Sequence, residues 1–214
     1  MKRRSLARCA GAALLFSSGA LALISAPTAA QLSQAATEGT QLASQREAGY
    51  PLRAYTLYAV QDTLKLEAKN GAVDAVTITT PYERTRYQAF ISVLGEDPIT
   101  PAVARQRAGL ENGQIGIMVF AHGATPSDQK FLAGFTPASL KLGSQTLKPV
   151  RTERSGVSVS QYPKTVGEIG VRFVGTVTYV FQVPSGLTAG RGTVSLSDAT
   201  GKSYVVPVDL THYR

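Results

Sequence analysis

His122 is the residue of this chain best suited to acid–base chemistry, because the imidazole side chain titrates closest to neutral pH. It follows the apolar segment 114–121 and precedes Gly123. A predicted strand therefore ends at His122 and a loop opens there, which is a position that active sites favour. The commoner role for such a histidine is a hydrogen bond to nearby backbone. The second histidine, His212, lies two residues before the end of the sequence and is expected on the surface.

A hydrolase would need a carboxylate or a serine close to His122, and the sequence alone does not identify that partner. The Gly-x-Ser-x-Gly form of a nucleophile elbow is missing, and so is a glycine loop of nucleotide-binding form. A structural zinc site needs four ligands, whereas the chain has two histidines and one cysteine. Glu96 and Asp97 are adjacent, and adjacent carboxylates do not converge easily on one calcium ion. The sequence therefore assigns no catalytic residue, no metal and no cofactor.

A second group of candidates combines basic and aromatic side chains, namely Tyr82, Arg84, Arg86, Tyr87, Arg105 and Arg107. Arginines bind anionic groups, so this cluster is a candidate contact for an anionic envelope polymer. Arg84 and Arg86 are two residues apart and point in different directions on a helix, which weakens a single binding surface. The alternative is a solvated helix face on which tyrosine lies over the sheet. The candidate binding residues are therefore Arg84, Arg86, Tyr87, Arg105, Arg107 and His122.

Residues 1–30 have the order of a secretory signal peptide: a basic start, an uncharged stretch rich in Ala and Leu, and small residues at the exit. A permanent membrane anchor is the competing interpretation, but serine and glycine dilute the apolar stretch. We expect cleavage after Ala30. Cys9, the only cysteine, would leave with the leader, so the mature protein would lack an intramolecular disulfide. This pattern predicts export to the periplasm or the cell surface of a bacterium.

The formal net charge of +8 depends in part on the leader. The leader contains four of the 22 basic residues and none of the 14 acidic ones, so its removal lowers the formal charge to +4. A modest positive charge favours contact with an anionic envelope polymer, although it is also ordinary for solubility. The expected partner is such a polymer or another envelope protein rather than nucleic acid. No transmembrane segment is expected after cleavage.

The region 31–49 is polar and small, which indicates a flexible lead-in or a frayed helix. Period-two alternation then predicts strands at 52–60, 63–68 and 73–79, the last two joined by a turn at 69–71. The apolar segment 114–121 predicts a strand that is covered on both faces. A hairpin is expected over 140–148, and further strands are expected at 169–183, 192–197 and 202–210.

Three Thr-Pro pairs mark predicted helix starts, because Thr can cap a helix and Pro suits its first position. Thr80-Pro81, with Glu83 completing a capping box, predicts a helix that ends at Gly95. We expect its apolar positions, Tyr87, Phe90, Ile91 and Leu94, to form a stripe that packs against a sheet. The pairs Thr100-Pro101 and Thr125-Pro126 predict a short helix up to Ala108 and another over 126–133.

The expected organisation has five parts: a signal peptide 1–30, a flexible lead-in 31–49, a mixed strand and helix region 50–149, a polar loop 150–167, and an antiparallel β region 168–214. Residues 50–214 are alternatively one continuous domain. The segment 150–167 is alternatively an edge hairpin. The predicted fold class is mainly β (α+β), an antiparallel sheet or β-sandwich with two or three short helices inserted in the N-terminal half, and with a mixed sheet over 50–135.

The last forty residues carry a resemblance to a known group. Segments 180–184, 192–196 and 201–210 alternate apolar and polar residues and have Pro and Gly at strand ends and turns. They resemble the closing strands of bacterial exported immunoglobulin-like sandwich domains. The resemblance implies a binding role and transfers no catalytic residue. The sequence thus favours an exported, non-enzymatic binding module, and the alternative is a secreted hydrolase that uses His122.

Overall fold

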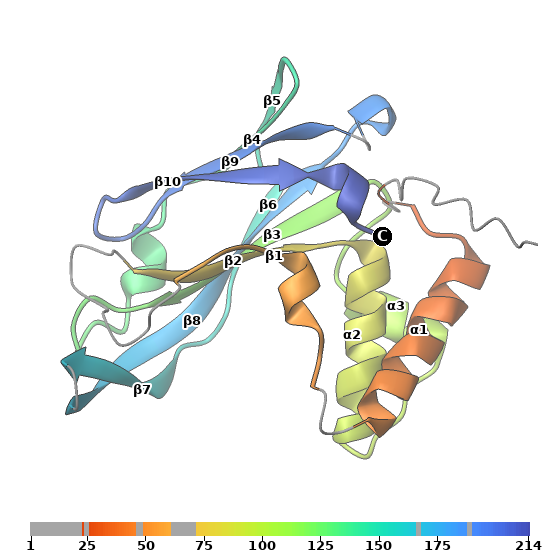
Figure 1. Ribbon diagram of the computed structural model, residues 1–214, viewed down its shortest axis with the longest axis horizontal. Helices are drawn as coiled ribbons and strands as arrows, with labels where there is room; N and C mark the ends of the chain where they lie inside the picture. The colour runs from red at the N-terminus through yellow and green to blue at the C-terminus, as the bar shows by residue number, and fades with distance from the viewer. Residues whose placement is uncertain (1–22, 24–25, 46–48, 61–71, 166–167, 188–189) are drawn as a thin grey trace, which may run out of the picture.

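The computed structural model describes residues 23, 26–45, 49–60, 72–165, 168–187 and 190–214, and for 163–165 and 168–169 only the backbone is described. Within these ranges the chain forms two antiparallel sheets and three α-helices, so the predicted mainly-β class is confirmed. Figure 1 shows the helices gathered at one side of the sheets, while strands β7 (Ser158–Thr165) and β8 (Glu168–Gln182) extend at the opposite side. Of the helices in these ranges, none is long and apolar enough to cross a lipid bilayer.

The larger sheet has the order β1-β2-β3-β8-β6, and β7 also pairs with β8. Its strands are β1 (Thr56–Ala59), β2 (Val73–Thr79), β3 (Gln114–His122), β6 (Arg151–Arg154), β7 (Ser158–Thr165) and β8 (Glu168–Gln182). The apolar segment that forms β3 lies between β2 and β8, so both of its edges are paired and most of its residues are buried. All of these pairings are antiparallel, and the predicted mixed sheet is wrong.

The smaller sheet has the order β10-β9-β4-β5. Its strands are β4 (Ser139–Leu142), β5 (Gln145–Leu147), β9 (Arg191–Ser197) and β10 (Ser203–Asp209), which confirms the hairpin and the last two strands expected from the sequence. Pro207 lies on β10, an edge strand, where its missing N–H leaves no ladder bond unmade.

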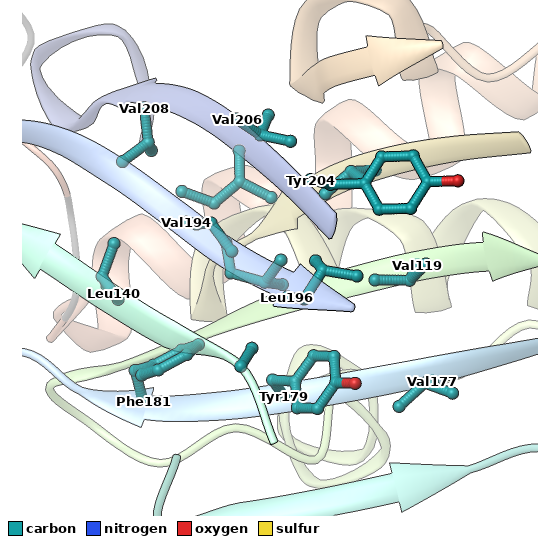
Figure 2. Packing of buried hydrophobic residues seen from close by; sticks show 14 of the residues in the cluster. Val119, Leu140, Val177, Tyr179, Phe181, Val194, Leu196, Tyr204, Val206 and Val208 are labelled. Carbon is teal, nitrogen blue, oxygen red and sulfur yellow. The ribbon is translucent and has the colours of Figure 1, made fainter. Parts of the chain in front are cut away.

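The hydrophobic core lies between the two sheets (Figure 2). Val119, Val177 and Phe181 face it from the larger sheet, and Leu140 and Val194 face it from the smaller one. Each of these side chains is fully buried, and burial of one such side chain contributes roughly 1.5–3 kcal/mol. Because β8 belongs to the same sheet as β2 and β3, residues 168–214 are not a β region apart from 50–149.

The N-terminal segment is more ordered than the sequence predicts. Residues Ala29–Ser44 form helix α1, whose first turn is closed by a capping box between Thr28 and Gln31. Ala35, Ala36 and Gly39 are buried, and α1 packs against helix α2 (Pro81–Leu94). The flexible lead-in expected at 31–49 is therefore wrong, and the alternative of a helix was closer. Small residues allow two helix backbones to approach closely without large apolar side chains. Of the predicted leader, only Leu23 and residues 26–30 belong to the described part.

Helix α2 (Pro81–Leu94) has the predicted bounds, with Thr80 as its N-cap and Gly95 as its C-cap. Its predicted orientation is wrong. Ile91 and Leu94 are 37% and 44% exposed, whereas Tyr82 and Ala89 are buried toward the other helices. Phe90 is buried as predicted, against Tyr50, but the stripe does not pack on a sheet. Helix α2 packs on α1 instead, and that contact uses small and polar residues.

Helix α3 (Pro101–Arg107) confirms the second Thr-Pro start. The third does not begin an α-helix, and the chain forms only a short 3₁₀ turn at Phe131–Gly134. The segment 150–167 contains β6 and β7, so the expectation of a polar loop is wrong and the alternative of an edge hairpin was closer. The strand predicted at 63–68 and its turn lie outside the described residues.

The remaining 3₁₀ turns are η2 (Leu52–Tyr55), which replaces the first half of the strand expected at 52–60, η6 (Ser185–Leu187) and η7 (Leu210–His212).

Candidate functional site

Three polar side chains from three different strands meet on the outer face of the larger sheet. Asp74 comes from β2, His122 ends β3, and Tyr162 comes from β7. On β3 the residues at 115, 117, 119 and 121 face the core, so His122 faces outward. Asp74 is the extra residue where the register of β2 against β3 shifts between Val73 and Ala75. A bulge of this kind redirects a side chain, which explains how Asp74 reaches the outer face.

His122 is held in a defined orientation. Its Nδ1 lies 2.8 Å from Oδ1 of Asp74, and its backbone N–H donates to the carbonyl of Ala72 at 2.9 Å. A carboxylate accepts hydrogen bonds, so Nδ1 is the donor in the first of these contacts. Within the described residues, Nε2 has no hydrogen-bond partner. The imidazole side chain is thus bonded to a carboxylate rather than to backbone, and its residue is only 8% exposed.

Tyr162 completes the cluster from the edge of the sheet. Its hydroxyl donates to Oδ2 of Asp74 at 2.5 Å, and its ring centroid lies 4.8 Å from that of His122. Burial, together with the hydrogen bond to Asp74, raises the pKa of Tyr162 above its usual value. The phenol therefore remains a hydrogen-bond donor across the neutral range, and the two oxygens of Asp74 are fixed by two different partners.

Beside this cluster lies an open hollow of about 510 Å³, which we call the β7 hollow. The side chains that supply hydroxyl or carboxylate groups to it are Asp74, Ser155, Ser158, Ser160, Tyr162 and Thr176, and apolar contacts come from Phe120 and Val174. His122 does not line the hollow, although it pairs across the sheet with Val174, which does. Among the described lining residues there is neither Lys nor Arg.

The hollow forms where the edge of the sheet is interrupted between β6 and β7. Ser155 lies in this interruption and holds the chain against β8. Its N–H donates to the carbonyl of Thr176, and its Oγ accepts from the N–H of Thr176. Gly175 leaves room for this close approach: a Cβ there would lie 2.9 Å from Cδ1 of Leu132 and 3.2 Å from Ser155 Oγ, so both side chains would have to shift. β7 then resumes pairing with β8 and forms one wall.

The Arg86 side chain bonds to other side chains of the protein. Its Nε and Nη2 donate to the hydroxyls of Tyr50 and Tyr55 at 3.2 Å each, and Nη1 lies 3.6 Å from Glu38 of α1. The guanidinium also lies 5.4 Å from the centres of both tyrosine rings. Such a packed and bonded arginine joins α1 and α2 to the segment before β1, which is a structural role.

The other basic candidates are dispersed. Arg84 lies 5.2 Å from the ring centre of Tyr87, which itself packs edge-on against Tyr50. Arg105 donates to the carbonyl of Leu110 and to Asn112, and it shares a second open hollow of about 460 Å³ with Arg151 and Glu111. Arg107 is exposed, and it makes no ion pair or hydrogen bond with the described residues.

Sequence reasoning found His122 but missed Asp74 and Tyr162. A lone carboxylate in the apolar run of β2 is a signal that could have drawn attention to Asp74. Tyr162 has no comparable signal, because its role depends on the pairing of β7 with β8. Within the described residues, no three metal-binding side chains converge on one point.

No family model, curated protein or solved structure matches this chain. The resemblance of its C-terminal strands to immunoglobulin-like domains thus stays a prediction.

Proposed function

We propose that the protein is an exported, non-enzymatic binding module of the bacterial cell envelope, and that its ligand occupies the β7 hollow. The composition of residues 1–30 supports export. The observation that supports binding is the hollow itself, which is open, falls within the size range of ligand sites, and brings a fixed carboxylate close to several hydroxyl groups. The partner is an envelope polymer or another envelope protein.

Export and binding are tested on cells that express the full-length chain. We expect the protein outside the cytoplasm, with an N-terminus at Gln31, and we expect it to sediment with purified envelope fragments. Ser158→Trp places a large ring in the hollow and should abolish sedimentation. Ser144→Trp, in the exposed turn between β4 and β5, is the matched control and should sediment normally. Recovery of the intact chain from the cytoplasm, or equal sedimentation of both variants, would contradict the proposal.

A secreted hydrolase is the second candidate, and one observation favours it. The Asp74 carboxylate is hydrogen-bonded to Nδ1 of His122. In Ser–His–Asp enzymes a carboxylate makes the same contact and orients the imidazole. Against this, no described serine is hydrogen-bonded to Nε2, and the imidazole does not line the hollow. Ester, amide and glycoside substrates should therefore remain intact. Turnover that His122→Gln abolishes would establish the hydrolase instead.

A further inference from the structure

The lining of the β7 hollow indicates the chemical class of its ligand. Its ionisable side chains are Asp74 and Tyr162, and the remaining polar side chains are hydroxyls. An anionic ligand would have to bury its charge beside the Asp74 carboxylate without a described cation among the lining residues, which is unfavourable. The anionic polymer expected from the basic residues is thus a poor match for this hollow.

The hydrogen-bonding groups of the hollow match a ligand that carries many hydroxyls. Each Asp74 oxygen accepts one bond from the protein, and a carboxylate oxygen can accept a second. The hydroxyls of Ser158 and Ser160 make no hydrogen bond with described residues, so they are available as donors and as acceptors. Serine hydroxyls both donate and accept hydrogen bonds, so they suit a ligand whose own hydroxyls do the same.

The apolar part of the lining favours a ligand with C–H faces between its hydroxyls. Phe120 and Thr176 are directly paired across β3 and β8, so their side chains lie next to one another on the same face. Phe120 is partly exposed there, and Val174 extends the apolar area on the next outward position of β8. Polyamines would use the carboxylate, but their ammonium groups only donate hydrogen bonds, so the donor capacity of the serine hydroxyls would remain unused.

We propose that the β7 hollow binds a neutral glycan segment, with sugar hydroxyls donating to Asp74 and bonding to the serines while a sugar face packs on Phe120. This inference rests on the proposed binding function and specifies its ligand class. It implies an affinity that barely depends on ionic strength, because no ion pair forms, whereas binding of an anionic polymer would weaken steeply with added salt.

The test is calorimetric titration of the protein purified from cells that express the full-length chain. The probes are neutral tetrasaccharides of β-1,4-glucose, α-1,4-glucose and β-1,4-N-acetylglucosamine, with tetragalacturonate and spermidine as charged comparisons. We expect at least one neutral probe to bind with affinity that changes less than about twofold between about 0.02 M and about 0.5 M salt. Asp74→Asn should weaken it by about tenfold or more, since hydrogen bonds to charged groups are the stronger ones.

Ser158→Trp should abolish glycan binding, and Ser144→Trp should leave it unchanged. Thermal unfolding of each variant verifies that it is folded, and the Ser158 variant covers the case in which Asp74→Asn fails to fold. Binding only of tetragalacturonate or of spermidine, or of no probe, overturns the glycan assignment. If the native protein then still sediments with envelope fragments and Ser158→Trp does not, the proposed binding function stands with a ligand of another class. If the native protein does not sediment with the fragments either, both the proposed function and the glycan assignment are wrong.

Discussion

Asp74 and His122 are 48 residues apart in the sequence, yet Oδ1 of the first lies 2.8 Å from Nδ1 of the second. The contact joins the bulge of β2 to the last residue of β3. The second oxygen of Asp74, Oδ2, accepts from the Tyr162 hydroxyl. The two contacts together fix the carboxylate that lines the β7 hollow. A pair of hydrogen bonds thus links the sheet edge to its interior at the candidate site.

Removal of the Tyr162 hydroxyl should weaken this cluster. Tyr162→Phe deletes the 2.5 Å bond to Asp74, and we expect the free energy of unfolding to fall by on the order of 1 kcal/mol in urea denaturation. Tyr87→Phe is the matched control, because the Tyr87 hydroxyl makes no hydrogen bond with the described residues. Equal stability of the two variants would mean that the Tyr162 bond is not formed in solution.

Gly39 is required for the close packing of α1 on α2. A Cβ at this position would lie 2.1 Å from the carbonyl oxygen of Arg86 and 3.0 Å from the Cβ of Ala89. In an unpacked helix Gly39→Ala would gain about 1 kcal/mol from helix propensity. We expect overpacking to outweigh that gain and to leave a net loss of about 1–2 kcal/mol, because the 2.1 Å clash is with a backbone atom that cannot move easily.

The control for Gly39→Ala is Thr40→Ala, one residue further along α1 and exposed. Its effect should stay within about 0.5 kcal/mol. Hydrogen exchange of the α1 amides measures the effect locally, and Gly39→Ala should lower their protection. Unchanged protection in Gly39→Ala would show that α1 and α2 do not pack in this way.

Asp198 ties the hairpin of β9 and β10 to the start of β2. Its Oδ2 accepts from the N–H of Ala72 at 2.7 Å and from the Tyr204 hydroxyl at 2.9 Å, and its Oδ1 accepts from Thr200. Burial alone would raise the pKa of Asp198, but the hydrogen bonds from Ala72, Thr200 and Tyr204 outweigh it and lower the pKa. We expect Asp198→Asn to destabilise the protein by about 1–3 kcal/mol at pH 7.

The Asp198 effect should depend on pH with a definite sign. A carboxyl with a lowered pKa in the folded state binds its proton less tightly there, so it stabilises the fold above its usual pKa of 3.8. That stabilisation is lost as the pH falls through the lowered value. Urea denaturation at neutral and acidic pH should therefore show a smaller gap between Asp198→Asn and the native protein in acid. Asp128→Asn is the control, and a gap that grows in acid would refute the assignment.

Glu83 should show the opposite pH dependence. It is 3% exposed, its Oε1 accepts from the Tyr50 hydroxyl at 2.9 Å, and its Oε2 has no hydrogen-bond partner among the described residues. Burial raises the pKa of Glu83 above its usual 4.5, although Arg84, Tyr50 and Arg86 oppose the shift. A raised pKa stabilises the fold below 4.5, and this contribution is lost as the pH rises through the folded-state value.

We therefore expect Glu83→Gln to gain stability relative to the native protein as the pH rises from acidic to mildly basic. Denaturation midpoints across that range measure the effect, and Glu96→Gln, at an exposed position after α2, should show no such trend. A relative stability of Glu83→Gln that falls with rising pH would show that this carboxylate is stabilised by a partner in solution.

The sequence by itself determined where most elements begin and end. Thr80 and Gly95 bound α2, and the apolar run of β3 predicts a strand covered on both faces, because caps and periodicity act within a few residues. It did not determine which face of α2 is buried. That choice depends on α1, whose small residues carry little apolar signal and become a packing surface only when a second helix approaches.

Only the tertiary structure decided the candidate site. Asp74, His122 and Tyr162 lie on three strands, and their meeting depends on the pairing of β3 with β8, on the bulge in β2 and on the interrupted edge at Ser155. Long-range strand pairing is set by the shared core between the sheets rather than by local propensity. The types of the residues were therefore visible in the sequence, whereas their convergence required the fold.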